Sequence, residues 1–484
     1  MIRKLNPQTI LLLALLCILA VRLVSLPMYP LMDTTEARYA EMSRKMLETG
    51  NWVTPLYDYD VPFWGKPPLS FWAGAVTMQI FGINELGARL APFIASILTG
   101  LLFFAWPFKE NRREKALLCF IVMQSTVIGF IGAGAVMTDE YLLLSTALCM
   151  VSFWKAMHSA TKNRLWGYLF FVGLAVGLLA KGPLVFVLAG FPLFWWVVVR
   201  KQWLNLWRKL PWLTGIILML AITVPWYWAA ENATPGFLRY FIIGEHFERF
   251  LVKGWEGDLY GSGHGRMKGT IWLYGLFCTF PWILLWPYAL YKKLFNRNFS
   301  ENLYLVLWML TPLLFFTFAS NILPAYALPG LAAFAILTAQ AVYNWQQKNS
   351  AVRYISAIPA LGLIVLAIAL FLTPLSGMLF TRSHKDLLSH WDGQSRLTYL
   401  DKRYYSSQFY SYGKAGVIEE LSPEIMTTEI FSFNGPQTVA VRKPEYEQYF
   451  ADKPQWRIVA IQKPKGRWYL LTNSGTATTD TVMP

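Results

Sequence analysis

The stretch that decides the fold is residues 8–26, which reads QTILLLALLCILAVRLVSL. Its length is close to the roughly 20 apolar residues that an α-helix needs to cross a bilayer. Arg3 and Lys4 precede it, and the sequence LPMYP follows at residues 26–30 without a small-residue cleavage site. These flanks predict an uncleaved first membrane span rather than a secretory signal peptide.

Similar apolar runs recur along most of the 484 residues and predict a polytopic α-helical membrane protein. The composition is 55% hydrophobic and only 15% charged, and the mean hydropathy is +0.37. A soluble protein carries roughly a quarter charged residues. We expect about eleven spans, near residues 8–26, 88–107, 116–135, 141–157, 166–180, 182–199, 210–229, 270–290, 302–319, 323–342 and 352–373.

Basic loops set the expected orientation. They lie near residues 109–113, 162–164, 200–201, 208–209, 292–293 and 353. If the short apolar stretch 67–83 does not span, these loops share one side with the N-terminus, and the positive-inside rule places that side in the cytoplasm. We therefore expect 67–83 to be an interfacial or re-entrant helix, with loops 28–87 and 230–269 in the periplasm. The formal charge of +15 belongs to such loops and does not indicate nucleic-acid binding.

The last hundred residues differ from the rest of the chain. Residues 438–441, 456–461 and 468–472 are rich in β-branched and aromatic side chains, which predicts short strands. We expect a membrane module over residues 1–373, followed by a periplasmic α/β domain of roughly 100 residues over 374–484.

The densest group of charged residues lies in the first outer loop, where residues 33–47 read DTTEARYAEMSRKML. Asp33 is suited to cap a helix that begins near Thr34 or Thr35. The carboxylates of Asp33 and Glu36 are candidates for proton transfer, and Arg38 is a candidate for anion binding. An amphipathic interfacial helix with ordinary charges on its wet face is an equally good interpretation of this stretch.

Lys66 directly precedes Pro67 and Pro68 at the start of an apolar segment. Proline at the first position fixes a helix start, and helix N-termini bind phosphate groups. Arg38 and Lys66 together would neutralise a lipid phosphate. The alternative is a lysine that extends to the lipid headgroups.

Two further charges flank apolar segments on the outer side. Asp139 lies at the edge of a span, and a carboxylate in that position is a functional candidate by default, with a surface turn as the alternative. Lys181 precedes Gly182 and Pro183 between two apolar helices. A lysine on the outer side runs against the usual loop bias and indicates a bound anion.

Two irregular segments complete the candidate site. The loop at residues 237–268 carries Glu245, His246, Arg249 and His264, and its length is typical of a lid or an acceptor channel. The spacing matches no compact metal motif, so we predict no metal site, although a divalent cation remains possible. Tyr326 belongs to the broken apolar segment SNILPAYALP, and irregular backbone at such depth is tolerated where it lines a cavity.

The order of these blocks resembles the GT-C membrane glycosyltransferases, in the bacterial branch of lipid A aminoarabinose transferase and protein O-mannosyltransferase-like enzymes. The blocks are T-E-x-R-Y-A-E, G-N-W-x-x-P, K-P-P, T-D, K-G-P, P-W-Y, E-H-F-x-R-F and L-P-x-Y-x-L-P. The resemblance covers most of residues 1–345 and returns more weakly at 404–414. It departs at Thr35, where the family has an aspartate, at Gly65, where it has an acidic residue, and at Ile322, where it has a basic one.

The resemblance implies a GT-C fold with periplasmic juxtamembrane helices. It also implies inverting transfer of a sugar from undecaprenyl phosphate, at the periplasmic face of the inner membrane, to lipid A or another lipopolysaccharide component. A protein acceptor stays open, and so does a flippase or transporter of lipid-linked sugars. We expect a monomer that contacts membrane lipids and binds no nucleic acid. The base candidates are Asp33, Glu36 and Asp139; the donor-phosphate candidates are Arg38, Lys66, Lys181, Arg249 and Tyr326; the acceptor or lid candidates are Glu245, His246 and His264.

Overall fold

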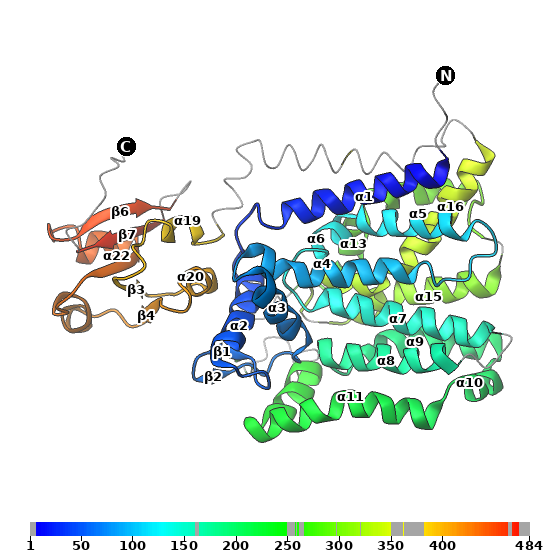
Figure 1. Cartoon of the computed structure of the whole chain (residues 1–484), viewed down its shortest axis with the longest axis horizontal. Coiled ribbons are helices and arrows are strands. Elements are labelled where there is room, and N and C mark those ends of the chain that lie inside the picture. The colour runs from blue at the N-terminus through cyan, green and yellow to red at the C-terminus, as the bar shows by residue number, and fades with distance from the viewer. Residues whose placement is uncertain are drawn as a thin grey trace.

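The computed structural model describes residues 6–159, 164–248, 257, 259–260, 266–296, 298–319, 321–349, 362, 382–462 and 467–473. Figure 1 shows a bundle of long helices on one side and a C-terminal sheet domain on the other. The short helices α2 (Thr35–Thr49) and α3 (Leu69–Phe81) and the hairpin β1–β2 (Leu56–Asp58 and Val61–Pro62) lie between them.

The bundle is built from apolar helices. Its elements are α1 (Pro7–Ser25), α4 (Glu85–Leu102), α5 (Arg112–Gln124), α6 (Val127–Gly132), α7 (Asp139–His158), α8 (Arg164–Lys181), α9 (Leu184–Arg200), α11 (Trp212–Ala233), α13 (Thr270–Cys278), α14 (Trp286–Tyr291), α15 (Phe299–Phe316) and α16 (Leu331–Lys348). Among the described residues, six helices are long and apolar enough to cross a membrane, and a pair bent by 92° at residues 279–281 raises the number to seven. The chain is therefore a multi-pass membrane protein.

The positions of the expected spans are confirmed, but several of the helices are broken, bent or shorter than a full span. Ten of them fall on helices of the bundle, but the span expected at 116–135 is divided between α5 and α6, and the one at 270–290 is the bent pair. Pro281 lies at that bend, where its ring removes a helical hydrogen bond. The length and hydropathy of a span are met by six or seven helices of the described chain rather than eleven. The expected span at 352–373 lies outside the described residues, apart from residue 362.

The segment expected to lie against the membrane is α3. Its 13 residues reach about 20 Å, which is shorter than the roughly 30 Å hydrocarbon core. One face of α3 packs against α2 and another against α4. Phe71 on α3 meets Tyr39 on α2 edge to face, with ring centroids 5.3 Å apart. This packing fixes α2, and the charged residues that it carries, beside the end of the bundle.

The C-terminal domain holds one five-stranded sheet in the order β4-β3-β5-β7-β6. Its strands are β3 (Arg396–Leu400), β4 (Gly416–Ile418), β5 (Gln437–Arg442), β6 (Arg457–Ile461) and β7 (Trp468–Thr472). β3 pairs in parallel with β4 and β5, and β7 is antiparallel to β5 and β6. The three strands expected from the sequence are confirmed as β5, β6 and β7. The other two were not expected.

Helix α20 (Tyr405–Tyr410) docks this domain onto the first outer loop. The Tyr410 hydroxyl donates to Glu85 at 2.8 Å and accepts from the Leu31 amide at 2.7 Å. The Lys385 ammonium lies 2.5 Å from the same Glu85 carboxylate. Phe409 belongs to the apolar cluster of α2 and α3. The end of the bundle and the sheet domain therefore face each other across a shared surface.

Candidate active site

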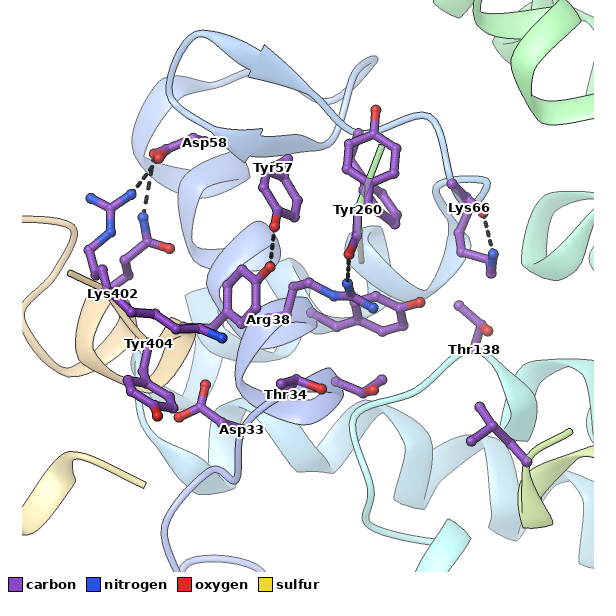
Figure 2. Close-up of a pocket in the computed structure, with 18 of the residues that line it drawn as sticks. Asp33, Thr34, Arg38, Tyr57, Asp58, Lys66, Thr138, Tyr260, Lys402 and Tyr404 are labelled. Atoms are coloured by element: carbon purple, nitrogen blue, oxygen red, sulfur yellow. Dashed lines mark hydrogen bonds and ion pairs between the residues drawn. The ribbon is translucent and has the colours of Figure 1, made fainter. Parts of the chain in front are cut away.

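A cavity of about 550 Å³ lies where the outer loops meet the C-terminal domain. That volume is in the usual range for a small-molecule site. Figure 2 shows Lys66 and Thr138 on one side of it and Asp58 and Lys402 on the other. Seven residues proposed from the sequence line the cavity: Asp33, Arg38, Lys66, Asp139, Lys181, Glu245 and Tyr326. Residues from the first outer loop and from four later segments of the chain therefore meet at one end of the bundle.

Asp33 lies in the turn before α2, but it does not cap that helix. Thr34 holds the N-cap position, and no side chain accepts a capping hydrogen bond there. The Asp33 carboxylate instead accepts from the amide of Ser406 at 3.1 Å and from the Ser406 hydroxyl. Burial raises the pKa of Asp33 from 3.8 to about 6, against the hydrogen bonds from Ser406, which lower it. A carboxyl group with this pKa is ionised at neutral pH and remains a competent proton acceptor.

Arg38 lies one turn further along α2 and points into the cavity. Its Nη1 donates to the main-chain oxygen of Tyr260 at 2.8 Å. The rings of Tyr39, Phe63 and Tyr405 surround the guanidinium, with centroids 5.3–6.0 Å from Cζ. The Nε donor is buried and makes no hydrogen bond within the described part of the chain. A planar cation held by rings at a cavity wall suits an anionic ligand.

Lys66 lies three residues before the start of α3, because the helix begins at Leu69 rather than at Pro67. Its ammonium lies 2.8 Å from Oε2 of Glu245 and also donates to the main-chain oxygen of Gly65. Glu245 comes from the π-helical turn η1 (Arg239–Glu248). Both side chains line the cavity, with Lys66 20% and Glu245 5% exposed. The outer loop therefore holds the lysine at the wall through a carboxylate 179 residues away.

Asp139 and Lys181 form a second ion pair in the cavity. Asp139 is the first residue of α7 and Lys181 the last of α8, and their side chains meet at 2.6 Å. The Lys181 ammonium also lies 4.9 Å from the ring centroid of Tyr326, on the 3-10 turn η3 (Pro324–Gly330). A largely buried pair of this kind is sensitive to loss of either partner, which leaves an uncompensated charge.

Glu36 does not line the cavity, and its assignment as a base is corrected. Its two carboxylate oxygens accept from Nε and Nη2 of Arg89 at 2.8 and 2.9 Å. Oε2 also accepts from the amide of Met32 at 3.1 Å. Arg89 is fully buried; its Nη1 donates to the main-chain oxygens of Leu26 and Tyr29, and its Nη2 also donates to that of Pro30. Glu36 therefore neutralises a buried arginine and ties α2 to α4.

His246 also lies outside the cavity lining. Its ring nitrogens contact the main-chain oxygens of Phe241 at 2.7 Å and Lys181 at 3.1 Å. It thus fixes η1 beside the end of α8. Arg249 and His264 lie outside the described residues. Within the described chain, no three His, Cys, Asp or Glu residues are grouped closely enough to hold a metal ion.

The C-terminal domain forms a whole wall of the cavity, although no site residue was predicted there from the sequence. That wall consists of Asp401, Lys402, Arg403, Tyr404, Tyr405, Gln408, Val417 and Glu419. Arg403 pairs with Asp58 of the first outer loop and donates to the Ala415 oxygen at 2.6 Å. The Tyr57 and Tyr405 hydroxyls are hydrogen-bonded across the same junction. The weak return of the family pattern at residues 404–414 was the one signal for this wall.

Comparison with known proteins gives consistent matches. Residues 9–241 match the family model described as dolichyl-phosphate-mannose-protein mannosyltransferase. The undecaprenyl phosphate-alpha-4-amino-4-deoxy-L-arabinose arabinosyl transferase of Enterobacter sp. (strain 638) is 33% identical over 66% of this chain and 56% of its own length. The corresponding protein of Aeromonas salmonicida (strain A449) is 32% identical over 72% of this chain and 63% of its own length. The chain thus spans a little over half the length of these relatives.

Solved structures show the same fold. The crystal structure of ArnT from Cupriavidus metallidurans bound to undecaprenyl phosphate aligns over 96% of this chain and 98% of that chain, with a TM-score of 0.78 and 20% sequence identity. Its apo form aligns over 96% and 97%, with a TM-score of 0.76. The expected fold class, a helical membrane module with a small C-terminal sheet domain, is confirmed.

Proposed function

Because this chain has the GT-C fold and is similar to the undecaprenyl phosphate-aminoarabinose arabinosyl transferases, we propose that it is an inverting glycosyltransferase. It takes a sugar from undecaprenyl phosphate and transfers it to lipid A or another lipopolysaccharide component. The observation that carries the proposal is one cavity in which Arg38, Lys66 and Lys181 of the membrane module lie with the buried Asp33 carboxylate, whose pKa is raised. It lies where lipid-embedded helices end and a polar domain begins.

Arg38, Lys66 and Lys181 form the leaving-group site. When the bond between the anomeric carbon and the phosphate oxygen breaks, the phosphate gains negative charge. Cations fixed at that oxygen stabilise the transition state more than the ground state, and this difference accelerates the reaction. Lys66 and Lys181 are held in place by Glu245 and Asp139. Arg38 lines the same cavity, where aromatic rings hold its guanidinium.

Asp33 is the general base of the proposed reaction. The acceptor hydroxyl oxygen bonds to the anomeric carbon on the face opposite the phosphate, and its proton passes to the Asp33 carboxylate. The electron pair of the broken bond leaves with undecaprenyl phosphate, so the anomeric configuration inverts. Asp139 is less suited to this role because its carboxylate already binds Lys181 at 2.6 Å. It orients Lys181 and the donor sugar.

The acceptor enters on the side of the C-terminal wall. The donor phosphate occupies the side with Lys66 and Lys181, where its lipid chain meets the bundle. The opposite wall offers Lys402 and the paired Arg403 together with carboxylates, tyrosines and an amide. Such mixed polar groups bind hydroxyl-rich acceptors through many hydrogen bonds.

The proposed orientation in the membrane rests on the basic loops, which the positive-inside rule assigns to the cytoplasm. We propose that the chain is a monomer of the inner membrane, with its N-terminus in the cytoplasm and the cavity in the periplasm. Residues 1–373 form the membrane module, and residues 374–484 form the periplasmic domain. Reporter fusions at residue 110 and after residue 473 test this orientation. The first must report the cytoplasm and the second the periplasm.

A protein acceptor is the second candidate, because the family model that matches residues 9–241 is described as a protein mannosyltransferase. Transport of lipid-linked sugars is the rival of another class. A transporter needs no buried base beside its cations, and its binding site usually lies near the bilayer midplane. The cavity instead lies at the helix ends, against the sheet domain.

Mass spectrometry of cells with and without the gene separates these functions. We expect a sugar mass increment on lipid A or lipopolysaccharide that disappears with the gene and in the Asp33→Asn variant. An increment on periplasmic protein instead would establish the second candidate. Unchanged glycans, with lipid-linked sugar redistributed across the membrane, would establish transport and refute transfer.

A further inference from the structure

The proposed base is held by the opposite domain of the protein. Asp33 belongs to the first outer loop, yet both carboxylate oxygens accept from Ser406 of α20. The Asp33 amide donates to the main-chain oxygen of Arg382 at 2.8 Å. Within the described residues, Asp33 makes no ion pair that would hold its side chain in another way. Its placement at the cavity therefore depends on the C-terminal domain.

The direction of the Ser406 hydrogen bond is fixed by a third group. The Ser406 hydroxyl oxygen accepts from the amide of His384 at 3.1 Å. An amide nitrogen can only donate, so the single hydroxyl proton of Ser406 is left to point at Asp33. A donor aimed at a carboxylate stabilises its ionised form. Ser406 is fully buried and does not line the cavity, so it reaches the substrates only through Asp33.

We propose that Ser406 is a positioning residue for the transfer reaction, which orients the Asp33 carboxylate toward the acceptor and keeps it ionised. This inference rests on the proposed function. It makes the C-terminal domain part of the catalytic machinery, in addition to its role as a wall. The chain of contacts runs from the His384 amide through the Ser406 hydroxyl to Asp33.

Few other titratable groups face Asp33. The Arg382 guanidinium lies on the C-terminal side and lowers its pKa. The Tyr399 hydroxyl of β3 bonds to Nδ1 of His384, whose pKa is lowered by burial to about 3. Tyr404 lies beside Asp33 across the cavity wall, and on α2 Arg38 is directed to Tyr260. Burial also raises the pKa of Tyr399, so neither His384 nor Tyr399 titrates near pH 6, and an acid limb in that range reports Asp33.

The test compares three variants of the full-length protein in detergent. Ser406→Ala removes the hydroxyl donor, Ser406→Thr keeps it, and Ser407→Ala is the matched control. Ser407 is the next residue of α20, equally buried, and its hydroxyl donates to Tyr404 at 2.6 Å rather than to Asp33. The donor is the lipid-linked sugar fraction of the host cells, and the acceptor is lipopolysaccharide from cells without the gene. We measure kcat/KM between pH 5 and 9, together with the Kd for undecaprenyl phosphate.

In Ser406→Ala we expect the acid limb of kcat/KM to move up by roughly one pH unit. We also expect kcat at pH 7 to fall about tenfold, while the Kd for undecaprenyl phosphate changes less than about twofold. Ser406→Thr restores both values, and Ser407→Ala keeps the wild-type limb. An unshifted limb in Ser406→Ala would overturn the proposal and leave Ser406 a structural residue. A wild-type protein that binds undecaprenyl phosphate but transfers no sugar would overturn the proposed function itself.

If the Ser406→Ala variant does not fold, a second variant tests the same proposal. Ser406→Cys keeps the volume and weakens the donor, so we expect a smaller shift of the acid limb in the same direction. The double variant Asp33→Asn/Ser406→Cys completes a mutant cycle. If Ser406 acts through Asp33, the second substitution adds less than about twofold to the loss from the first. Full additivity of the two losses would contradict the proposal.

Discussion

The two sides of the cavity are held by different interactions. On the bundle side, ion pairs fix Lys66 to Glu245 at 2.8 Å and Lys181 to Asp139 at 2.6 Å. On the side of the C-terminal domain, neutral donors of one serine hold Asp33. The ion pairs fix both ammonium groups at the cavity wall. Asp33 is held by neutral donors, which lower its pKa only in part, so burial still raises it to about 6. In the proposed reaction, the bundle side therefore serves the leaving group, and Asp33 serves proton transfer.

The largest effect is expected for Asp33→Asn, which removes the base but keeps the shape of the side chain. We expect kcat for sugar transfer to fall about 10³–10⁴-fold, with undecaprenyl phosphate binding unchanged within about twofold. Asp139→Asn is the comparison on the other side of the cavity, and it must keep the acid limb of the wild type. If Asp139→Asn abolished that limb and Asp33→Asn did not, the roles of the two carboxylates would be exchanged.

Lys66→Ala comes next, because it removes one fixed cation from the leaving group. We expect kcat/KM to fall about 10²–10³-fold and the affinity for undecaprenyl phosphate to fall with it. Lys443→Ala is the matched control, since this lysine is exposed on the sheet domain and pairs weakly with Glu447. Full activity of the Lys66→Ala protein would remove Lys66 from the leaving-group site.

The pH dependence of the wild type sharpens the contrast further. Asp33 is active as a carboxylate, and burial raises its pKa to about 6. The value of kcat/KM should therefore be level above pH 7 and fall about tenfold per unit below pH 6. An acid limb near pH 4, the range of an exposed aspartate, would show that the base is another group.

The smallest effect is expected for Lys402→Ala on the C-terminal wall. This lysine is exposed and its ammonium lies 5.8 Å from the ring centroid of Tyr404. We expect the KM for the acceptor to rise about threefold, as for a weak surface contact, and donor affinity to stay unchanged. Lys414→Ala is the control from the same segment outside the cavity lining. A change in donor affinity with Lys402→Ala would reverse the assignment of the two walls.

The bundle side of the site was largely predictable, because its signals are local. Lys66 before two prolines, Asp139 at the edge of a span and Lys181 before Gly182 are unusual in their own surroundings. Burial of polar groups near a membrane is costly, so each position indicates a function by itself. The helical spans were predictable for the same reason, apart from the break between α5 and α6 and the bend before α14.

The roles of Glu36 and Asp33 could not be predicted, because they depend on partners far away in the sequence. Glu36 resembles a catalytic carboxylate until Arg89, 53 residues later, is seen to bind both of its oxygens. Asp33 resembles a helix cap until Ser406 is placed beside it. Serine in a short polar segment carries no signal of its own, and no periodicity links positions 33 and 406. Such contacts come from the packing of two domains rather than from local pattern.

The contact between Asp33 and Ser406 also sets an order of events during biosynthesis. Ser406 is made 373 residues after Asp33, when the described helices of the bundle have already left the ribosome. The proposed base is held in place only once the C-terminal domain has folded and docked through α20. In the proposed reaction, a chain without this domain would bind lipid-linked sugar but could not transfer it. Docking of the C-terminal domain is then the step that makes the base available.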